Sequence, residues 1–230
     1  MHTKSFILQI FCLITLFASL SLQAQQKNAV SEVLSHHQVL SIINDSVKKA
    51  FNIDMPIFRV YKYTDTSGQY FCVLTESNDS FAIIEGESDT AHHTIRAIDL
   101  KLENGKFIKV WEINDFIKRS FPEISIWFWT KFCEFQDFDN DGLIEPIIVY
   151  GTHSTDEING NRVKFIIYYK GQKIAIRHQD SDLDESRSTE VDKAFHSLPA
   201  KLKETIKAKM VLMNKLLLTI IEKSTLDHLL

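Results

Sequence analysis

The apolar residues of the chain recur first at helical spacing and then at strand spacing. Residues 35–51 carry apolar side chains at steps of three or four, which predicts an amphipathic helix. A second series at such steps predicts a long C-terminal helix that begins near Leu198, with apolar positions Leu202, Ile206, Met210, Met213, Leu217 and Ile220. The lysines on its other face also suit an anionic membrane surface, but we favour packing of the apolar stripe against a sheet.

Between these helices the apolar period changes to two, which is typical of strands with one buried face. The segments with this period are residues 57–63, 69–76, 80–85, 94–102, 106–113, 145–152, 162–170 and 173–178. Asn104 and Gly105 separate two of them and indicate a tight hairpin turn. Residues 124–135 are apolar at both parities, which predicts a central strand that is covered on both faces. A surface aromatic patch that stacks on sugars is the alternative interpretation.

These segments predict an α+β fold for residues 25–230. Neither a linker-like change of composition nor a repeat of fixed period divides this part of the sequence. We therefore expect one domain, in which an antiparallel sheet of about eight or nine strands is covered by an N-terminal helix and the long C-terminal helix.

The first 24 residues have the pattern of a signal peptide. Lys4 precedes an apolar run at residues 6–20, and Ala24 ends the segment before two glutamines. Cys12 lies inside the run and not at its end, which argues against a lipoprotein. The expected product is a soluble protein of the periplasm or the extracellular space, with no transmembrane segment after cleavage of the signal peptide.

Composition and charge narrow the class of protein further. The chain has 230 residues, of which 44% are hydrophobic and 24% are charged, so disordered and fibrous classes are excluded. The formal net charge is −4, which argues against a nucleic-acid-binding protein of the usual basic kind.

Two cysteines remain after the predicted cleavage. Cys72 and Cys133 both lie in strand-like segments, and an oxidising compartment permits a disulfide between them if the two strands are neighbours. The alternative is a pair of free thiols in the core. The sequence leaves both alternatives open.

The segment DFDNDGLIE at residues 137–145 carries the clearest chemical signal. Short acidic side chains at alternate positions of a tight loop can point inward together, and Ca²⁺ prefers six to eight oxygen ligands. The candidate ligands are Asp137, Asp139, Asp141, the carbonyl of Leu143, and Glu145. An EF-hand would need a glutamate where Ile148 stands, so the predicted calcium loop is of another type. The alternative is an acidic turn that is satisfied by backbone amides and water.

This segment, which runs directly into a strand, resembles the calcium loop of FG-GAP and VCBS-type repeats, where the loop joins two strands of a β-propeller blade. The resemblance implies that Asp137, Asp139, Asp141 and Glu145 are calcium ligands. It covers about fifteen residues in one copy, so it does not imply a propeller. The wider runs IWFWTKFC, DFDNDGLIEPIIVYGT and YYKGQKIAIRHQ resemble a family of uncharacterised exported proteins of Gram-negative bacteria, some of which are labelled surface-polysaccharide proteins.

A second polar surface is expected at the opposite end of the strands. If residues 145–152, 162–170 and 173–178 form consecutive antiparallel strands, the loops at 153–161 and 179–190 share the end away from the acidic loop. Long polar loops often carry binding function, although solvated connections have the same composition. The candidate binding residues are His153, Asp156, Glu157, His178, Asp182 and Asp184.

The sequence contains none of the common catalytic signatures, such as HExxH, GxSxG or a P-loop. The leading hypothesis is an exported, calcium-binding or calcium-stabilised binding or structural module without catalysis of its own. Its partner would be an envelope protein or a polysaccharide. The alternatives are a periplasmic inhibitor or immunity protein, and an envelope hydrolase whose catalytic residues are dispersed along the chain.

Overall fold

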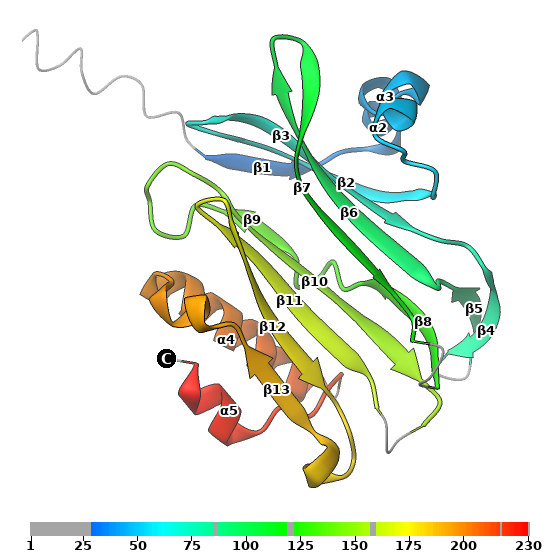
Figure 1. Ribbon diagram of the computed structural model, residues 1–230, viewed down its shortest axis with the longest axis vertical. Helices are drawn as coiled ribbons and strands as arrows, with labels where there is room; N and C mark the ends of the chain where they lie inside the picture. The colour runs from blue at the N-terminus through cyan, green and yellow to red at the C-terminus, as the bar shows by residue number, and fades with distance from the viewer. Residues whose placement is uncertain (1–28, 85–86, 119–121, 157–159, 217, 230) are drawn as a thin grey trace, which may run out of the picture.

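The computed structural model describes residues 29–84, 87–118, 122–156, 160–216 and 218–229. The predicted signal peptide at residues 1–24 lies outside these ranges. The described chain is an α+β structure in which every strand pairing is antiparallel. Figure 1 shows two stacked sheets with helices on their outer faces.

The first sheet has five strands in the order β1-β2-β3-β6-β7. Its strands are β1 (Val30–Val33), β2 (Ile57–Asp65), β3 (Gly68–Glu76), β6 (Thr94–Glu103) and β7 (Lys106–Phe116). A separate two-stranded hairpin, β4 (Ser80–Ile84) and β5 (Glu87–Ala91), is inserted between β3 and β6. The turn between β6 and β7 contains Asn104 and Gly105, both with positive φ, so the predicted hairpin is confirmed.

The second sheet has six strands, with β13-β12-β11-β10-β8 in order and β9 paired to β10. Its strands are β8 (Glu123–Phe128), β9 (Glu134–Gln136), β10 (Glu145–Ser154), β11 (Arg162–Tyr169), β12 (Gln172–Gln179) and β13 (Ser188–Val191). The prediction that β10, β11 and β12 are consecutive neighbours is confirmed.

The prediction of a single sheet of eight or nine strands is wrong, because the strands are divided among separate sheets. In β10, Ile147 and Val149 face one apolar cluster while Ile148 and Tyr150 face another. A strand buried on both faces is compatible with a second sheet above it as well as with a helix.

The predicted strand at residues 124–135 is also shorter than expected. Strand β8 ends at Phe128, and a turn follows in which the Phe132 amide donates to the Trp129 carbonyl at 2.8 Å. The chain then resumes pairing with β10 as β9. Both strands therefore lie along the same neighbour, and the break lets one apolar segment cover two parts of β10.

The helices form two pairs. The predicted N-terminal helix is divided into α2 (His36–Ile42) and α3 (Asp45–Ala50), because Asn44 caps the second helix by accepting a hydrogen bond from the Val47 amide at 3.1 Å. The predicted long C-terminal helix is α4 (Ala200–Lys215), which is followed by α5 (Lys223–His228). Ile220 lies beyond α4 and is exposed. Two short 3₁₀ turns are η1 (Asp184–Ser186) and η2 (Lys193–Ser197).

Three apolar clusters separate four layers (Figure 1). Val60, Phe71 and Ile98 of the five-stranded sheet pack toward α2 and α3. Tyr63, Leu74 and Ile113 of the same sheet meet Ile148, Tyr150 and Ile166 of the six-stranded sheet. Val149, Phe165 and Ile176 pack on Leu202, Ile206 and Met210 of α4. The order of layers is therefore helix, sheet, sheet, helix.

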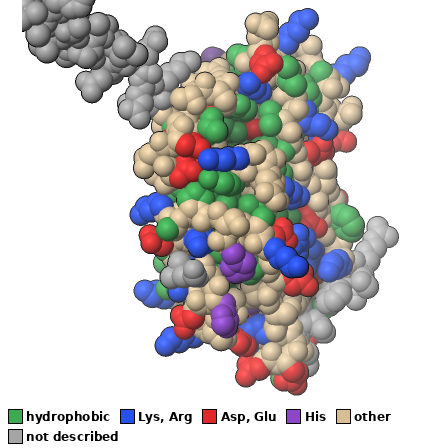
Figure 2. Space-filling view, turned by 60° about the vertical axis from the view of Figure 1, so that its left-hand side comes forward, with side chains coloured by type: hydrophobic (Ala, Val, Ile, Leu, Met, Phe, Trp, Pro, Cys, Tyr) green, Lys and Arg blue, Asp and Glu red, His purple; other side chains and the backbone are tan. Residues whose placement is uncertain are grey.

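None of the helices in the described ranges is long and apolar enough to cross a membrane. On the face shown in Figure 2, acidic and basic side chains are interspersed around apolar ones and form no continuous basic stripe.

Candidate metal centre

The acidic loop at residues 137–145 connects β9 to β10 and is shaped by its own side chains. Asn140 has a φ of 60° and Gly142 a φ of 87°, so the backbone turns sharply between the acidic residues. The Asp137 carboxylate accepts hydrogen bonds from the amides of Asp141 at 3.1 Å and Gly142 at 2.9 Å. The Asp141 carboxylate accepts from the Leu143 amide at 2.9 Å. These bonds turn the aspartate side chains toward the inside of the loop.

Four carboxylates meet inside this loop. One oxygen each from Asp137, Asp139, Asp141 and Glu145 lies within 4.8 Å of the others. Glu145 is buried, with 2% of its surface exposed, and it accepts a hydrogen bond from the Phe138 amide at 2.8 Å. This cluster could hold a metal ion.

The loop is fastened to the five-stranded sheet by the turn after β2. Thr66 donates from its amide at 2.9 Å and from its hydroxyl at 3.0 Å to the Gly142 carbonyl. The Ile144 amide donates to the Asp65 carboxylate at 3.2 Å. A Cβ at Gly142 would lie 2.8 Å from Thr66 Cγ2 and would force one of the two segments to move. Glycine is therefore required here both for the positive φ and for the close approach of Thr66.

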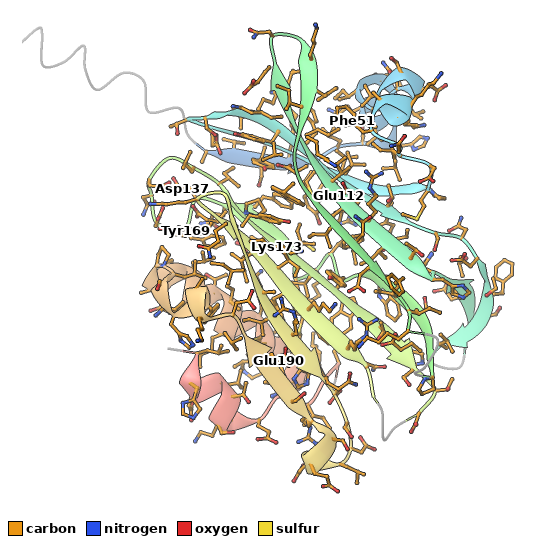
Figure 3. The ribbon with its side chains drawn as sticks, in the orientation of Figure 1. Phe51, Glu112, Asp137, Tyr169, Lys173 and Glu190 are labelled. Carbon is orange, nitrogen blue, oxygen red and sulfur yellow. The ribbon has the colours of Figure 1, made fainter. Side chains whose placement is uncertain are left out.

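The last residue of β11 and the first residue of the turn after it cover the other side of the loop. The Tyr169 hydroxyl donates to Asp139 at 3.0 Å, and Lys170 Nζ lies 3.1 Å from Asp141 Oδ2 and 4.0 Å from Asp139 Oδ2. Figure 3 shows Asp137 and Tyr169 at the same end of the six-stranded sheet. Lys170 is half exposed, so it neutralises the rim of the cluster and not its buried side.

The electrostatics of the loop differ between its buried and exposed sides. Burial raises the pKa of Glu145 to about 7; the Phe138 amide opposes this shift, and the charges of Asp139, Asp141 and Asp137 add to it. Burial also opposes ionisation of Asp141, but the Leu143 amide and Lys170 lower its pKa. Glu145 is therefore the member of the cluster that most needs a cation.

The second predicted surface is only partly assembled. The loops after β10 and β12 do lie at the end opposite the acidic loop. Asp182 and Asp184 are exposed, and Asp184 pairs with Arg187 at 3.0 Å. Asp156 is half-buried, and its amide donates to Ser154 Oγ at 3.1 Å. Glu157 lies outside the described residues.

The two histidines predicted for this surface have different surroundings. His178 is buried on β12, where its Nδ1 is 2.8 Å from Thr189 Oγ1. Its Nε2 has no hydrogen-bond partner within the described part of the chain and lies 3.9 Å from Asp180. His153 is half-buried near the end of β10, beside β8. A buried His178 cannot contribute to an exposed recognition surface.

The structure contains free thiols at Cys72 and Cys133. Cys72 is buried on β3, whereas Cys133 lies between β8 and β9 and not on a strand. Cys133 Sγ accepts a hydrogen bond from the Val149 amide at 3.3 Å and donates to its carbonyl at 3.6 Å. Burial raises the pKa of Cys133 to about 12 and that of Cys72 well above its usual value. Neither thiol is activated as a nucleophile.

Sequence reasoning missed two features. One is the anchoring of the acidic loop by Asp65 and Thr66. It depends on contact between the two sheets, which no local sequence pattern indicates. The other missed feature is a cavity of about 510 Å³ whose lining includes Glu76, His92 and Trp127. These residues come from three separate segments, so no local sequence pattern joins them.

Comparisons of the chain with protein-family models, with curated proteins and with solved structures give no match.

Proposed function

We propose that residues 137–145 form a calcium site. The observation that carries this proposal is the convergence of four carboxylates, one of them buried, within 4.8 Å. Like charges at this separation repel one another, and burial of Glu145 increases the cost of its ionisation. A divalent cation among these oxygens removes both penalties.

Calcium fits this loop better than the other common divalent cations. All candidate side-chain ligands are carboxylate oxygens, which suit Ca²⁺ or Mg²⁺ and not the thiolate and imidazole sites that Zn²⁺ prefers. Several protein oxygens supplied by one short loop match the irregular six- to eight-fold coordination of Ca²⁺, whereas Mg²⁺ needs a near-ideal octahedron and retains its waters. The carbonyl of Leu143, which follows the sharp turn at Gly142, would supply a further oxygen.

The proposed role of the metal is structural. The loop lies between β9 and β10 and is bonded to the turn after β2, so a bound ion would join parts of both sheets. We therefore propose an exported, calcium-stabilised binding or structural module of the periplasm or cell surface, with no catalysis of its own. The pattern of residues 1–24 supports export, and the polar loops at the other end of the six-stranded sheet remain the proposed contact with an envelope protein or polysaccharide.

Thermal unfolding in calcium, in magnesium and in a chelator tests the metal site. For a dissociation constant of ~10⁻⁴ M, calcium at about 1 mM adds roughly 1.4 kcal/mol to the free energy of unfolding. We expect the midpoint to rise with calcium and to change little with magnesium. An identical midpoint in calcium and in chelator would refute the proposal.

Matched variants separate the charge of the loop from its hydrogen bonds. Asp139→Asn keeps an acceptor for the Tyr169 hydroxyl but removes one ligand charge, so it should abolish the calcium-dependent shift. Tyr169→Phe removes the same hydrogen bond and leaves the carboxylate, so it should retain the shift. Loss of the shift in both variants would indicate that calcium binding depends on the Tyr169 hydrogen bond and not on the charge of Asp139 alone.

A further inference from the structure

The cavity of about 510 Å³ lies where the β4–β5 hairpin meets β8. Its walls carry two carboxylates, Glu76 and Asp89, together with His92 and the aromatic rings of Phe58 and Trp127. Lysine and arginine are absent from its described lining. None of its lining residues belongs to the acidic loop, so the cavity is independent of the calcium proposal.

The contacts of His92 define which of its ring nitrogens carries the proton. Its Nδ1 contacts the Ser77 carbonyl oxygen, which can only accept, so Nδ1 carries a proton. The backbone around the ring is held by two bonds: the His92 amide donates to Ser125 Oγ at 3.0 Å, and the Ile126 amide donates to the His92 carbonyl at 2.8 Å. In the neutral ring, Nε2 is therefore an acceptor.

The Glu76 carboxylate places a second acceptor near His92 Nε2. The residue is 5% exposed, and its Oε1 accepts a hydrogen bond from the Phe128 amide at 2.8 Å. Its Oε2 lies 3.8 Å from His92 Nε2, which is too far for a hydrogen bond. Neither atom has a hydrogen-bond partner in the described residues. A group with two donors, lying within hydrogen-bond distance of both atoms, would satisfy both.

The surrounding charges favour a cationic donor. Glu76 and Asp89 both line the cavity, and Arg59 is not part of the lining. The Arg59 guanidinium lies 5.5 Å from the ring centre of Phe58 and 6.0 Å from that of Tyr61. Burial raises the pKa of Glu76, and the charge of Arg59 opposes this shift only in part. A primary ammonium carries three donors and no acceptor, so it leaves no polar group unsatisfied in such a site. Its alkyl chain suits the apolar wall that contains Phe58 and Trp127.

We propose that this cavity binds a primary ammonium group on a short alkyl chain. Glu76 Oε2 and His92 Nε2 accept hydrogen bonds from the ammonium, Asp89 adds negative charge at the exposed side, and Phe58 and Trp127 contact the chain. The same chemistry is offered by a free alkylamine and by a lysine side chain of a partner protein.

Calorimetric titration with three probes tests this proposal. Each probe carries its terminal amine or hydroxyl group on a chain of five carbons. Cadaverine represents the free amine, Nα-acetyl-lysine methylamide represents the lysine side chain, and 1,5-pentanediol is the neutral control. We expect saturable binding of at least one amine with a dissociation constant near or below about 1 mM, and at least tenfold weaker binding of the diol. The amine that binds more tightly shows whether the site favours a free alkylamine or a lysine side chain. Absence of binding by both amines, or equal binding of the diol, would overturn the proposal.

Variants then assign the binding to Glu76. Glu76→Gln keeps an acceptor for the Phe128 amide and can donate to His92 Nε2, so the fold should be retained while amine binding falls at least about tenfold. Asp89→Asn changes an exposed side chain, so its effect on amine binding does not depend on a change in the fold. It should weaken amine binding by a smaller factor than Glu76→Gln does. Glu204→Gln, at an exposed position of α4 and outside the cavity, should bind as the unmodified protein does. Undiminished binding in both Glu76→Gln and Asp89→Asn would contradict the assignment.

Discussion

The two ends of the layer between the sheets both bury carboxylates, but only one end buries cations with them. At the paired end, Arg162 Nη2 donates to Glu123 at 2.9 Å, and Lys164 Nζ donates to Asp115 at 2.6 Å. At the acidic end, Asp65, Asp99 and Glu145 line a cavity of about 190 Å³. The side chains of Lys170 and of Lys101, near Gly68, lie at the margins of this end.

The difference appears in the pKa values of the two ends. Burial opposes ionisation of Asp115, but Lys164 and Arg162 lower its pKa. Burial raises the pKa of Asp99 to about 7 despite the hydrogen bond from Tyr63, and nearby Asp65 adds to the shift. Asp115 and Glu123 at the paired end already have cationic partners within the protein, whereas the acidic end carries negative charge that a bound cation or a proton would stabilise.

The largest expected effect is at the paired end. Arg162→Met leaves Glu123 buried with 6% exposure and without its cation, which should lower the free energy of unfolding by about 3–5 kcal/mol. Urea unfolding measures this change. The double variant Glu123→Leu with Arg162→Met removes both charges, so its free energy of unfolding should fall less than that of the single variant. An equal or larger loss in the double variant would show that packing of Arg162, not charge pairing, holds this end together.

At the acidic end, removing a charge should have the opposite effect. The pKa of Asp99 is raised in the folded state, so the folded state binds the proton more tightly and stability falls as the pH rises from about 4 to about 7. Asp99→Asn should therefore raise the free energy of unfolding at pH 8, by on the order of 3 kcal/mol. The gain should disappear toward pH 4, where Asp99 is protonated in the folded protein.

Asp115→Asn is the matched control in the same pH series. Its lowered pKa means that ionised Asp115 stabilises the folded state above the ordinary aspartate pKa, and that this contribution is lost as the pH falls. The variant should be less stable than the unmodified protein near neutral pH. In acid the free energies of unfolding of the two proteins should converge. Parallel pH profiles for the Asp99 and Asp115 variants would contradict the division into paired and acidic ends.

The acidic loop was predictable because one short segment supplies all its carboxylates. Alternate aspartates and Gly142 are visible without knowledge of the fold, and the structure brings Asp137, Asp139, Asp141 and Glu145 together. The hairpin at Asn104 and Gly105 was predictable for the same local reason. Both features depend on backbone conformation within a few residues.

The division into two sheets was not predictable in this way. Apolar residues at both parities show that both faces of a strand are buried, but they do not show whether a helix or another sheet covers each face. In β3, Phe71 and Val73 face the helix side, while Cys72 and Leu74 face the second sheet. The cavity at Glu76 and His92 was missed for a related reason, because it requires the register of β3, the β4–β5 hairpin and β8 together.

A smaller effect is expected from Lys170, which competes with the proposed calcium ion. Its Nζ lies 3.1 Å from Asp141 Oδ2, and the side chain is 53% exposed. Lys170→Met removes this competing positive charge, so calcium affinity measured by calorimetry should rise about two- to fivefold, in the range of an exposed ion pair. Lys106→Met, at the start of β7, is the control and should leave the affinity unchanged. Weaker calcium binding in Lys170→Met would show that Lys170 supports the loop instead.

The smallest effect on stability is expected at the loops beyond the paired end, where Asp182 and Asp184 are exposed. Asp184 meets Arg187 at 3.0 Å, but its side chain is 86% exposed, so this pair contributes little. Asp182→Asn and Asp184→Asn should each change the free energy of unfolding by less than about 0.5 kcal/mol, measured by urea unfolding. Because the fold is expected to be unaffected, a loss of binding to an envelope protein or polysaccharide in these variants would be a direct effect. Variants that unfold early and still bind would place recognition elsewhere and would show that the paired end depends on its surface loops.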